Sequence, residues 1–308
     1  MPFLALGSYR IRYELEGPDD GPAYVLVNGL TQYAELWAGY RAALSARGFR
    51  VATFDMLGQG ESDKPGLFIS QDDQVAALGL LIDQVGRKQV FLGGISFGGL
   101  IALRYAIAHS DRLAGLVAMS SFAELSPQLL LLGNALRTGL ILGGTGYLQD
   151  LLLPMNLSDA WLGPRLGNLE AVKRQGWLTN DVYALQNLME SFLDFQPLTL
   201  QLGAITVPTL ILNGEFDFLT PRSLHESLRV HVKDSALVII PEAYHAFTLE
   251  KPDLTADLLA RFAEEVLAKK WKGGQSVWIA PEMAGGALVP FPPEQDHLRA
   301  IPKVTVPT

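Results

Sequence analysis

The sequence contains no cysteine. Disulfide bonds, thiolate metal sites and a cysteine nucleophile are therefore excluded. Charge is also scarce, since only 18% of the residues are charged, and the formal net charge is -8. The densest group of cations, Lys269, Lys270 and Lys272, ends a predicted helix, where positive charge suits the helix dipole. Such a chain is a poor candidate for binding nucleic acid or an anionic membrane.

Long hydrophobic runs are missing as well. The most apolar segment, residues 125–142, falls short of a membrane span because Pro127, Gly133 and Arg137 interrupt it. The N-terminus has neither the charged start nor the long apolar stretch of a signal peptide. We expect a cytoplasmic protein that does not bind membranes, and the sequence leaves both a monomer and a homodimer open.

The first part of the chain alternates short apolar runs with amphipathic segments. The strand-like runs are residues 9–16, 23–27, 50–54, 89–92 and 113–119, and the helix-like segments are 36–47, 71–85 and 97–109. Ser70 is placed to cap the second of these helices. Strands and helices that alternate at this spacing predict an α/β fold, with a mostly parallel sheet covered by helices on both faces.

This alternation stops between residues 121 and 204, where leucine-rich helical stretches alternate with glycine, proline and asparagine. Strand-like runs resume at residues 209–212 and 237–240, and an amphipathic helix follows from Pro252 to about Lys270. A helical block therefore interrupts one α/β domain, and the sheet is completed after it.

The domain organisation follows from this interruption. We predict an α/β core domain made of residues 1–120 and 205–270, with a helical cap over residues 121–204. Residues 271–308 are rich in proline and glycine and contain one strand-like piece, residues 276–280. We interpret them as a C-terminal extension that either packs on the body or on a partner chain, or is disordered.

The segment Gly94-Ile95-Ser96-Phe97-Gly98 matches the pattern G-x-S-x-G. The pattern alone arises by chance often enough to be weak, but this copy lies directly between a strand-like run and a helix. A sharp strand-to-helix turn lifts the serine hydroxyl clear of the sheet edge, and side chains at Gly94 and Gly98 would collide across it. The position therefore predicts that Ser96 is a nucleophile.

A serine hydroxyl is a weak nucleophile and needs a base, for which the chain offers five histidines. Four of them are poorly placed: His109 at a helix end, His225 and His231 in a polar helical stretch where we expect them to be solvated, and His297 in the extension. His245 lies in a loop just after a predicted strand. Loops at the carboxyl ends of parallel strands gather around one crevice, which favours His245 as the base.

The base in turn needs a carboxylate that holds its tautomer. Glu215 and Asp217 both follow the strand at residues 209–212, and either could serve. Asp217 is better placed because it lies beyond the turn that Gly214 starts. The chain order serine, aspartate, histidine is the order expected of α/β-hydrolases.

Acyl transfer also requires hydrogen-bond donors for the developing oxyanion. We expect one donor to be the backbone N–H of Phe97, directly after the nucleophile. The second is predicted in the loop Asn28-Gly29-Leu30-Thr31, where the backbone N–H of Leu30 is the best candidate. No cofactor and no metal enter this scheme.

These motifs make the chain similar to the α/β-hydrolase superfamily over about residues 9–270. The segment from Asp55 to Asp63 resembles the D-x-x-G-x-G-x-S-D turn of capped members, and we interpret it as structural, with Asp55 anchoring the turn. Residues 245–252 resemble the H-x4-E-x-P pattern that follows the catalytic histidine. The resemblance implies a mostly parallel eight-stranded sheet with an inserted helical cap.

Within the superfamily the chain looks most like the esterase and 3-oxoadipate enol-lactonase branch. Asn28-Gly29 replaces the common His-Gly pair, and lactonase-like members also lack that histidine. Ser96 argues against haloalkane dehalogenases and epoxide hydrolases, which use an aspartate nucleophile, and Ile95 argues against carbon–carbon bond hydrolases, which usually carry asparagine there. The resemblance implies a serine hydrolase that acts on a small, fairly apolar carboxylic ester or lactone.

The cap is expected to roof the substrate pocket. We predict that Leu129, Leu136 and Trp161 line it, together with Tyr244, which stands where glycine often precedes the histidine. Two other functions remain open on the same residues. One is a cofactor-free perhydrolase or haloperoxidase, and the other is a non-catalytic signalling member of the fold that binds a small ligand and a protein partner.

Overall fold

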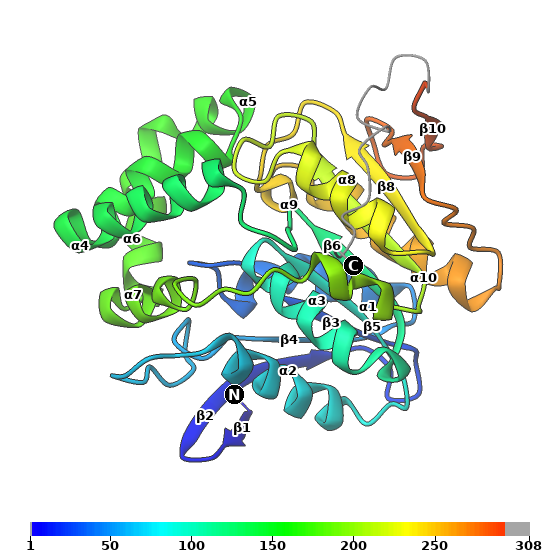
Figure 1. Ribbon diagram of the computed structural model, residues 1–308, viewed down its shortest axis with the longest axis horizontal. Helices are drawn as coiled ribbons and strands as arrows, with labels where there is room; N and C mark the ends of the chain where they lie inside the picture. Colours follow the sequence, from blue (N-terminus) through cyan, green and yellow to red (C-terminus); the bar gives the residue numbers. More distant parts are fainter. Residues whose placement is uncertain (1, 293–308) are drawn as a thin grey trace, which may run out of the picture.

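A ten-stranded sheet forms the centre of the computed structural model, which describes residues 2–292 (Figure 1). The strands are β1 Phe3–Leu6, β2 Tyr9–Glu16, β3 Ala23–Val27, β4 Arg50–Phe54, β5 Val90–Ile95, β6 Leu113–Met119, β7 Thr209–Gly214, β8 Ser235–Ile240, β9 Ser276–Ile279 and β10 Val289–Pro290. Their order across the sheet is β1-β2-β4-β3-β5-β6-β7-β8-β9-β10. The strands from β4 to β9 in this order pair in parallel, whereas β1, β2 and β10 pair antiparallel.

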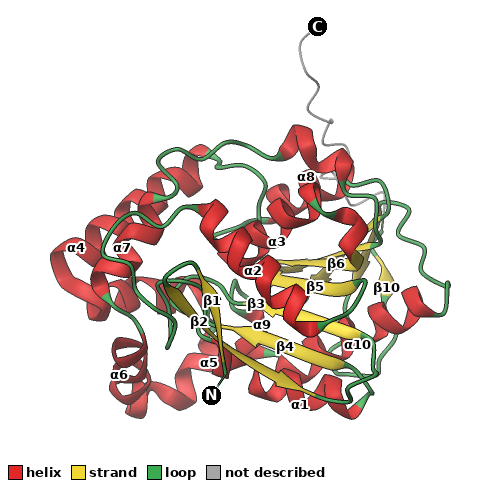
Figure 2. Ribbon diagram, turned by 90° about the horizontal axis from the view of Figure 1, so that it is seen from below, coloured by secondary structure: helices red, strands yellow, loops and turns green. Residues whose placement is uncertain are grey.

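Helices cover both faces of this sheet (Figure 2). The α-helices are α1 Ala38–Ala46, α2 Gln71–Val85, α3 Phe97–Ala108, α4 Pro127–Asn156, α5 Asp159–Leu162, α6 Leu169–Thr179, α7 Val182–Glu190, α8 Arg222–His231, α9 Phe247–Glu250 and α10 Pro252–Leu267. Short 3-10 turns are η1 Ala34–Trp37, η2 Ser110–Arg112, η3 Gly163–Asn168 and η4 Thr199–Ala204. Helices α2, α3 and α8 pack into one hydrophobic cluster, and α1 and α10 pack into a second one. Because helices cover both faces, β3, β5, β7 and β8 are buried along their whole length, which explains their continuous apolar sequence.

The boundaries of α2 show how local sequence sets one element. The side chain of Ser70 accepts a hydrogen bond from the backbone N–H of Asp73, whose carboxylate accepts one in return from the backbone of Ser70. This reciprocal capping box satisfies two backbone donors that the helix itself leaves unpaired. At the other end, Gly86 adopts the left-handed conformation with φ 70°, which stops the helix. The predicted cap at Ser70 is confirmed.

The predicted fold class is confirmed, but the predicted strand count of eight is wrong. The two additional strands lie in the C-terminal segment, where β9 pairs in parallel with β8 and β10 pairs with β9. The sequence shows that residues 276–280 are strand-like, yet it carries no signal for the partner strand, which lies 40 residues earlier. Residues 293–308, and with them His297, lie outside the described residues.

The segment between β6 and β7 forms helices α4 to α7, which group together at one end of the sheet (Figure 1). We call residues 121–204 the helical insertion. Helix α4 consists of two helical pieces joined at Gly144, whose φ of 70° and ψ of -171° are not helical. No helix within residues 2–292 is both long enough and apolar enough to cross a membrane.

Candidate active site

Ser96 stands at a sharp turn between a strand and a helix. Strand β5 ends at the residue before it and helix α3 begins at the residue after it, and Ser96 itself has φ 54° and ψ -121°. A side chain on Gly94 would lie 2.3 Å from the carbonyl oxygen of Gly98, and one on Gly98 would lie 2.4 Å from that of Asn28. The surrounding glycines therefore permit a strained backbone that raises the serine hydroxyl above the sheet.

His245 lies in the loop between β8 and α9, and its ring connects two of the predicted residues. Its Nε2 atom is 3.0 Å from Oγ of Ser96. Its Nδ1 atom is 3.0 Å from both carboxylate oxygens of Asp217. The structure therefore brings the three side chains into one continuous line of hydrogen bonds, in the arrangement that activates a serine.

Asp217, in the loop between β7 and α8, is buried and fully hydrogen-bonded. Thr220 donates to its carboxylate twice, from the backbone N–H to Oδ1 and from the hydroxyl to Oδ2, each at 2.8 Å. Burial pushes the pKa of Asp217 upward, but the charge that His245 can carry and its hydrogen bond outweigh this effect, so the pKa lies below its usual value. Sequence reasoning missed Thr220, although an aspartate three residues before it is a common turn pattern.

Glu215, the other predicted acid, lies elsewhere. Its side chain is exposed, and its Oε2 atom accepts a hydrogen bond from the backbone N–H of Glu242 at 2.9 Å. Gly214, at the end of β7, lies against the histidine loop. A side chain there would come within 2.4 Å of the carbonyl oxygen of Tyr244. The absence of a side chain at this position lets the aspartate loop and the histidine loop approach each other closely.

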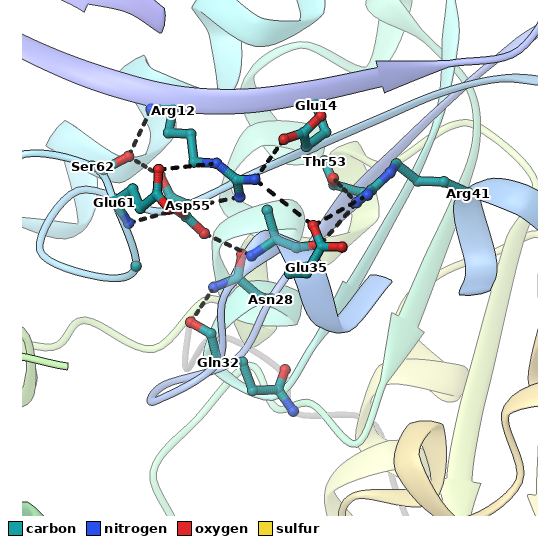
Figure 3. A network of polar contacts seen from close by, with 12 residues as sticks. Arg12, Glu14, Asn28, Gln32, Glu35, Arg41, Thr53, Asp55, Glu61 and Ser62 are labelled. Atoms are coloured by element: carbon teal, nitrogen blue, oxygen red, sulfur yellow. Dashed lines mark hydrogen bonds and ion pairs between the residues drawn. The ribbon is translucent and has the colours of Figure 1, made fainter. Parts of the chain in front are cut away.

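The loop after β3 contains Leu30, and a set of side-chain contacts holds it in shape (Figure 3). Asn28 donates from Nδ2 to the carbonyl oxygen of Gln32 at 2.9 Å, and Oε1 of Gln32 accepts from the backbone N–H of Gly29 at 2.9 Å. Within residues 2–292, neither the backbone N–H of Leu30 nor that of Phe97 has an acceptor in the protein. Both residues line the cavity that contains Ser96, so both donors are free to meet a ligand.

Asp55 binds the first residue of η1, directly after this loop, and also its own turn (Figure 3). Its carboxylate accepts hydrogen bonds from the backbone N–H of Ala34 at 2.6 Å and from that of Glu61 at 2.8 Å, and Nη1 of Arg12 lies 3.5 Å away. Burial raises the pKa of Asp55, and the two N–H donors and Arg12 oppose that rise. The interpretation of Asp55 as the anchor of a structural turn is confirmed by these bonds.

A largely apolar cavity of about 600 Å³ opens on Ser96 and His245. Side chains from the helical insertion form most of its wall, among them Leu125, Leu129, Leu136, Leu148, Leu152, Leu185, Met189 and Phe192. Of the four predicted pocket residues, Leu129 and Leu136 line the cavity, whereas Trp161 and Tyr244 do not. The indole N–H of Trp161 instead donates to the carbonyl oxygen of Leu249, and the ring of Tyr244 packs on Phe216.

Beyond Ser121, four hydrogen bonds among the described residues join the helical insertion to the segments of the site. Three reach the histidine loop or helix α9 directly after it: Ala246 N–H donates to the carbonyl oxygen of Asn156, Glu250 Oε1 accepts from the backbone N–H of Ser158, and Trp161 donates to Leu249. The fourth reaches the loop of Leu30, where Nδ2 of Asn180 donates to the carbonyl oxygen of Thr31 at 3.0 Å. The insertion is therefore anchored on both sides of Ser96.

The remaining histidines differ from expectation in one case. His109 is exposed at the end of α3, and His231 is half-buried at the end of α8. His225, on the same helix, is 0% exposed, so the prediction that it is solvated is wrong. Among the described residues, no group of three or more histidine and carboxylate side chains is placed to hold a metal ion.

Comparison with known proteins identifies the family to which the chain belongs. The family model described as serine aminopeptidase S33, a family of hydrolases, matches residues 22–252. The chain belongs to this family. Members of the α/β-hydrolase superfamily share its fold, and the chain is a hydrolase of that superfamily.

The relatives of this S33-family chain described next cover between 83% and 86% of it. A 2-hydroxy-6-oxononadienedioate/2-hydroxy-6-oxononatrienedioate hydrolase of Klebsiella pneumoniae is 28% identical, over 83% of this chain and 92% of that protein. The enol-lactonase of Burkholderia xenovorans LB400 superposes with a TM-score of 0.77 at 22% identity, covering 86% of this chain and all of the other. A thermophilic esterase of Thermogutta terrifontis gives 0.74 at 25% identity, covering 84% and 94%.

Proposed function

We propose that this hydrolase cleaves a carboxylic ester or lactone with an apolar acyl group, through an acyl-enzyme on Ser96. The observation that carries the proposal is the line of hydrogen bonds from Asp217 through His245 to Ser96, 3.0 Å at each step, which ends in an apolar cavity. Ester and lactone carbonyls are among the acyl groups that such a serine attacks without a cofactor.

In the proposed first step, Oγ of Ser96 attacks the carbonyl carbon while Nε2 of His245 accepts the serine proton. The carbonyl oxygen becomes an oxyanion, and the backbone N–H groups of Leu30 and Phe97 donate to it. Asp217 holds Nδ1–H of His245 in place and stabilises the imidazolium that forms. A pKa of Asp217 below the usual value keeps this carboxylate ionised over the working range of pH.

In the second half of the reaction, His245 passes its proton to the leaving alcohol oxygen, and the acyl group stays on Ser96. Water then attacks the acyl-enzyme, with His245 as base, and releases the carboxylic acid and the free serine. For a lactone the leaving oxygen belongs to the same molecule, so one ring-opened hydroxy acid is released.

The cavity supports the choice of an apolar acyl group. Its wall consists mainly of leucine, phenylalanine and methionine side chains, and its volume of about 600 Å³ exceeds what an acetyl group fills. The structural neighbours include an enol-lactonase and an esterase, which agrees with an ester or lactone substrate. We infer a medium-length acyl chain rather than the shortest ones, because the buried apolar area grows with each methylene.

The test is hydrolysis of p-nitrophenyl esters from acetate to decanoate, with Ser96→Ala beside the wild type. We expect turnover to be highest at medium chain length and to fall at least about a thousandfold in Ser96→Ala, because the covalent step is lost. Ser8→Ala removes an exposed serine in the turn between β1 and β2, which does not line the cavity, and serves as the matched control, with unchanged turnover expected.

A fluorophosphonate probe gives an independent reading of the same proposal. We expect mass spectrometry to find the label on the peptide that contains Ser96 in the wild type and in Ser8→Ala. Equal ester turnover by the wild type and Ser96→Ala, or a label on another serine, contradicts the assignment.

A further inference from the structure

His225 is a buried histidine that the proposed reaction does not use. Its Nε2 atom lies 3.0 Å from the backbone nitrogen of Ser121, and its Nδ1 atom lies 3.3 Å from the carbonyl oxygen of Pro221. A backbone N–H can only donate and a carbonyl oxygen can only accept, so the ring must be neutral, with its proton on Nδ1. Burial lowers the pKa of His225 to about 4, which agrees with the neutral form.

The backbone that His225 contacts lies at the end of β6, where two serines follow the strand. The hydroxyl of Ser120 donates to the carbonyl oxygen of His245 at 2.8 Å. The hydroxyl of Ser121 donates to the carbonyl oxygen of Ser96 at 3.2 Å. Two consecutive residues therefore contact the nucleophile segment and the base segment directly.

His225 extends these contacts to the third segment. Pro221, which accepts its Nδ1–H, lies four residues after Asp217 and directly before α8. Ser120 is buried and has φ 41°, a left-handed conformation that a non-glycine residue holds only when its surroundings fix it. Together the three side chains make one set of contacts from Ser96 to the aspartate loop and the histidine loop.

We propose that Ser120, Ser121 and His225 are positioning residues, which hold the three segments of the site at the spacing that acyl transfer needs. The inference rests on the proposed function, because it assigns these residues to the same reaction. None of the three lines the cavity, so they act through Ser96, Asp217 and His245 rather than on the substrate. A displacement of about 1 Å in a catalytic group can lower the rate about a hundredfold. Contacts that prevent such displacements therefore support the rate.

The test compares His225→Leu with His225→Gln. Leucine removes both ring nitrogens, whereas Oε1 of glutamine reaches about as far as Nε2 and accepts from the backbone N–H of Ser121. We expect kcat on a short p-nitrophenyl ester to fall about tenfold or more in His225→Leu with KM changed less than about twofold, and to return to within about threefold in His225→Gln. The rate of fluorophosphonate labelling at Ser96 is expected to follow kcat.

Two further variants keep the test decisive. Ser121→Ala leaves the backbone N–H in place and removes only the hydroxyl, and a loss of kcat of about threefold to tenfold is expected even if His225→Leu does not fold. His231→Leu replaces the last histidine of the same helix, away from the site, and is expected to keep the wild-type kcat.

The results separate this inference from the proposed function. Wild-type kcat and labelling rates in His225→Leu and Ser121→Ala overturn the positioning role, even when Ser96→Ala is inactive. Equal losses in His225→Leu and His225→Gln, in step with a lower melting temperature, assign His225 to stability alone and also overturn it. Full activity in Ser96→Ala instead overturns the proposed function, and the positioning role falls with it.

Discussion

The candidate site has two sides that differ in the contacts that form them: a sheet side, made of the strand ends and the loops after them, and an insertion side, made of the helical insertion. On the sheet side, β5, β7 and β8 end at Ser96 and at the loops of Asp217 and His245, and hydrogen bonds of about 3 Å fix these side chains. On the insertion side, a kinked helix and leucine side chains form the wall, and Leu131 and Leu142 of that helix are 69% and 81% exposed. Directed hydrogen bonds form the sheet side, whereas packing of apolar side chains forms the insertion side.

This difference indicates which side determines the reaction and which side determines the acyl group that is accepted. Directed hydrogen bonds work at one geometry only, so under the proposed function the sheet side sets the reaction. Apolar packing tolerates exchange among side chains of similar volume, so the insertion side can set the acyl group without changing the reaction. Changes on the two sides should therefore give different kinetic signatures.

The largest effect is expected from the acid on the sheet side. In Asp217→Asn the amide favours the wrong tautomer of His245, so we expect kcat to fall by about 10³- to 10⁴-fold with a small change in KM. Glu215→Gln removes the neighbouring carboxylate, which is exposed and bonded to Glu242, and is expected to change kcat less than about twofold. Steady-state kinetics on one ester measure both, and a larger loss in Glu215→Gln would reverse the assignment of the acid.

A change of shape on the insertion side should act on chain length instead. Leu129→Trp fills part of the cavity, so we expect kcat/KM for octanoate relative to acetate to fall about 10- to 100-fold, since one methylene in a pocket is worth about 1–3 kcal/mol. Leu131→Trp changes an exposed position on the same helix and should leave the ratio unchanged. If both variants lose activity on all chain lengths alike, the insertion does not select the acyl group.

The smallest effect concerns stability, and it reports the buried polar contacts behind the sheet side. The folded pKa of His225, about 4, lies below its ordinary value of 6.5, so between these values the unfolded chain binds a proton that the folded chain does not. This group therefore lowers stability as the pH falls from about 6.5 towards 4. Relative to wild type, His225→Gln should lose about 2 kcal/mol less of its free energy of unfolding between pH 7 and pH 5, measured by urea titration. An equal loss in both proteins would mean that His225 is charged in the folded state.

The positions of Ser96, Asp217 and His245 could be predicted because each depends on local sequence. A strand end, a glycine-rich turn and a loop are visible as patterns, and parallel strands bring their carboxyl ends to one edge. Asp217 rather than Glu215 followed from its place beyond Gly214 in the loop.

The remaining features depend on contacts between distant segments, which a single sequence does not show. His225 looked solvated because α8 is rich in polar residues, yet its partner Ser121 lies 104 residues earlier. Trp161 was predicted to line the pocket under the cap, yet its indole N–H donates to the carbonyl oxygen of Leu249, 88 residues later. For the same reason, the strand-like segment 276–280 gave no sign that it would extend the sheet beside β8.

The anchors of the helical insertion have an evolutionary consequence. Of the four hydrogen bonds described above, those of Asn156 and Ser158 use backbone atoms of the insertion, and those of Trp161 and Asn180 use its side chains. Side chains at other positions of the insertion can therefore change without breaking these four bonds. Under the proposed function, substitutions in the cavity wall that keep these bonds would open the site to new substrates across generations, while the chemistry is inherited unchanged.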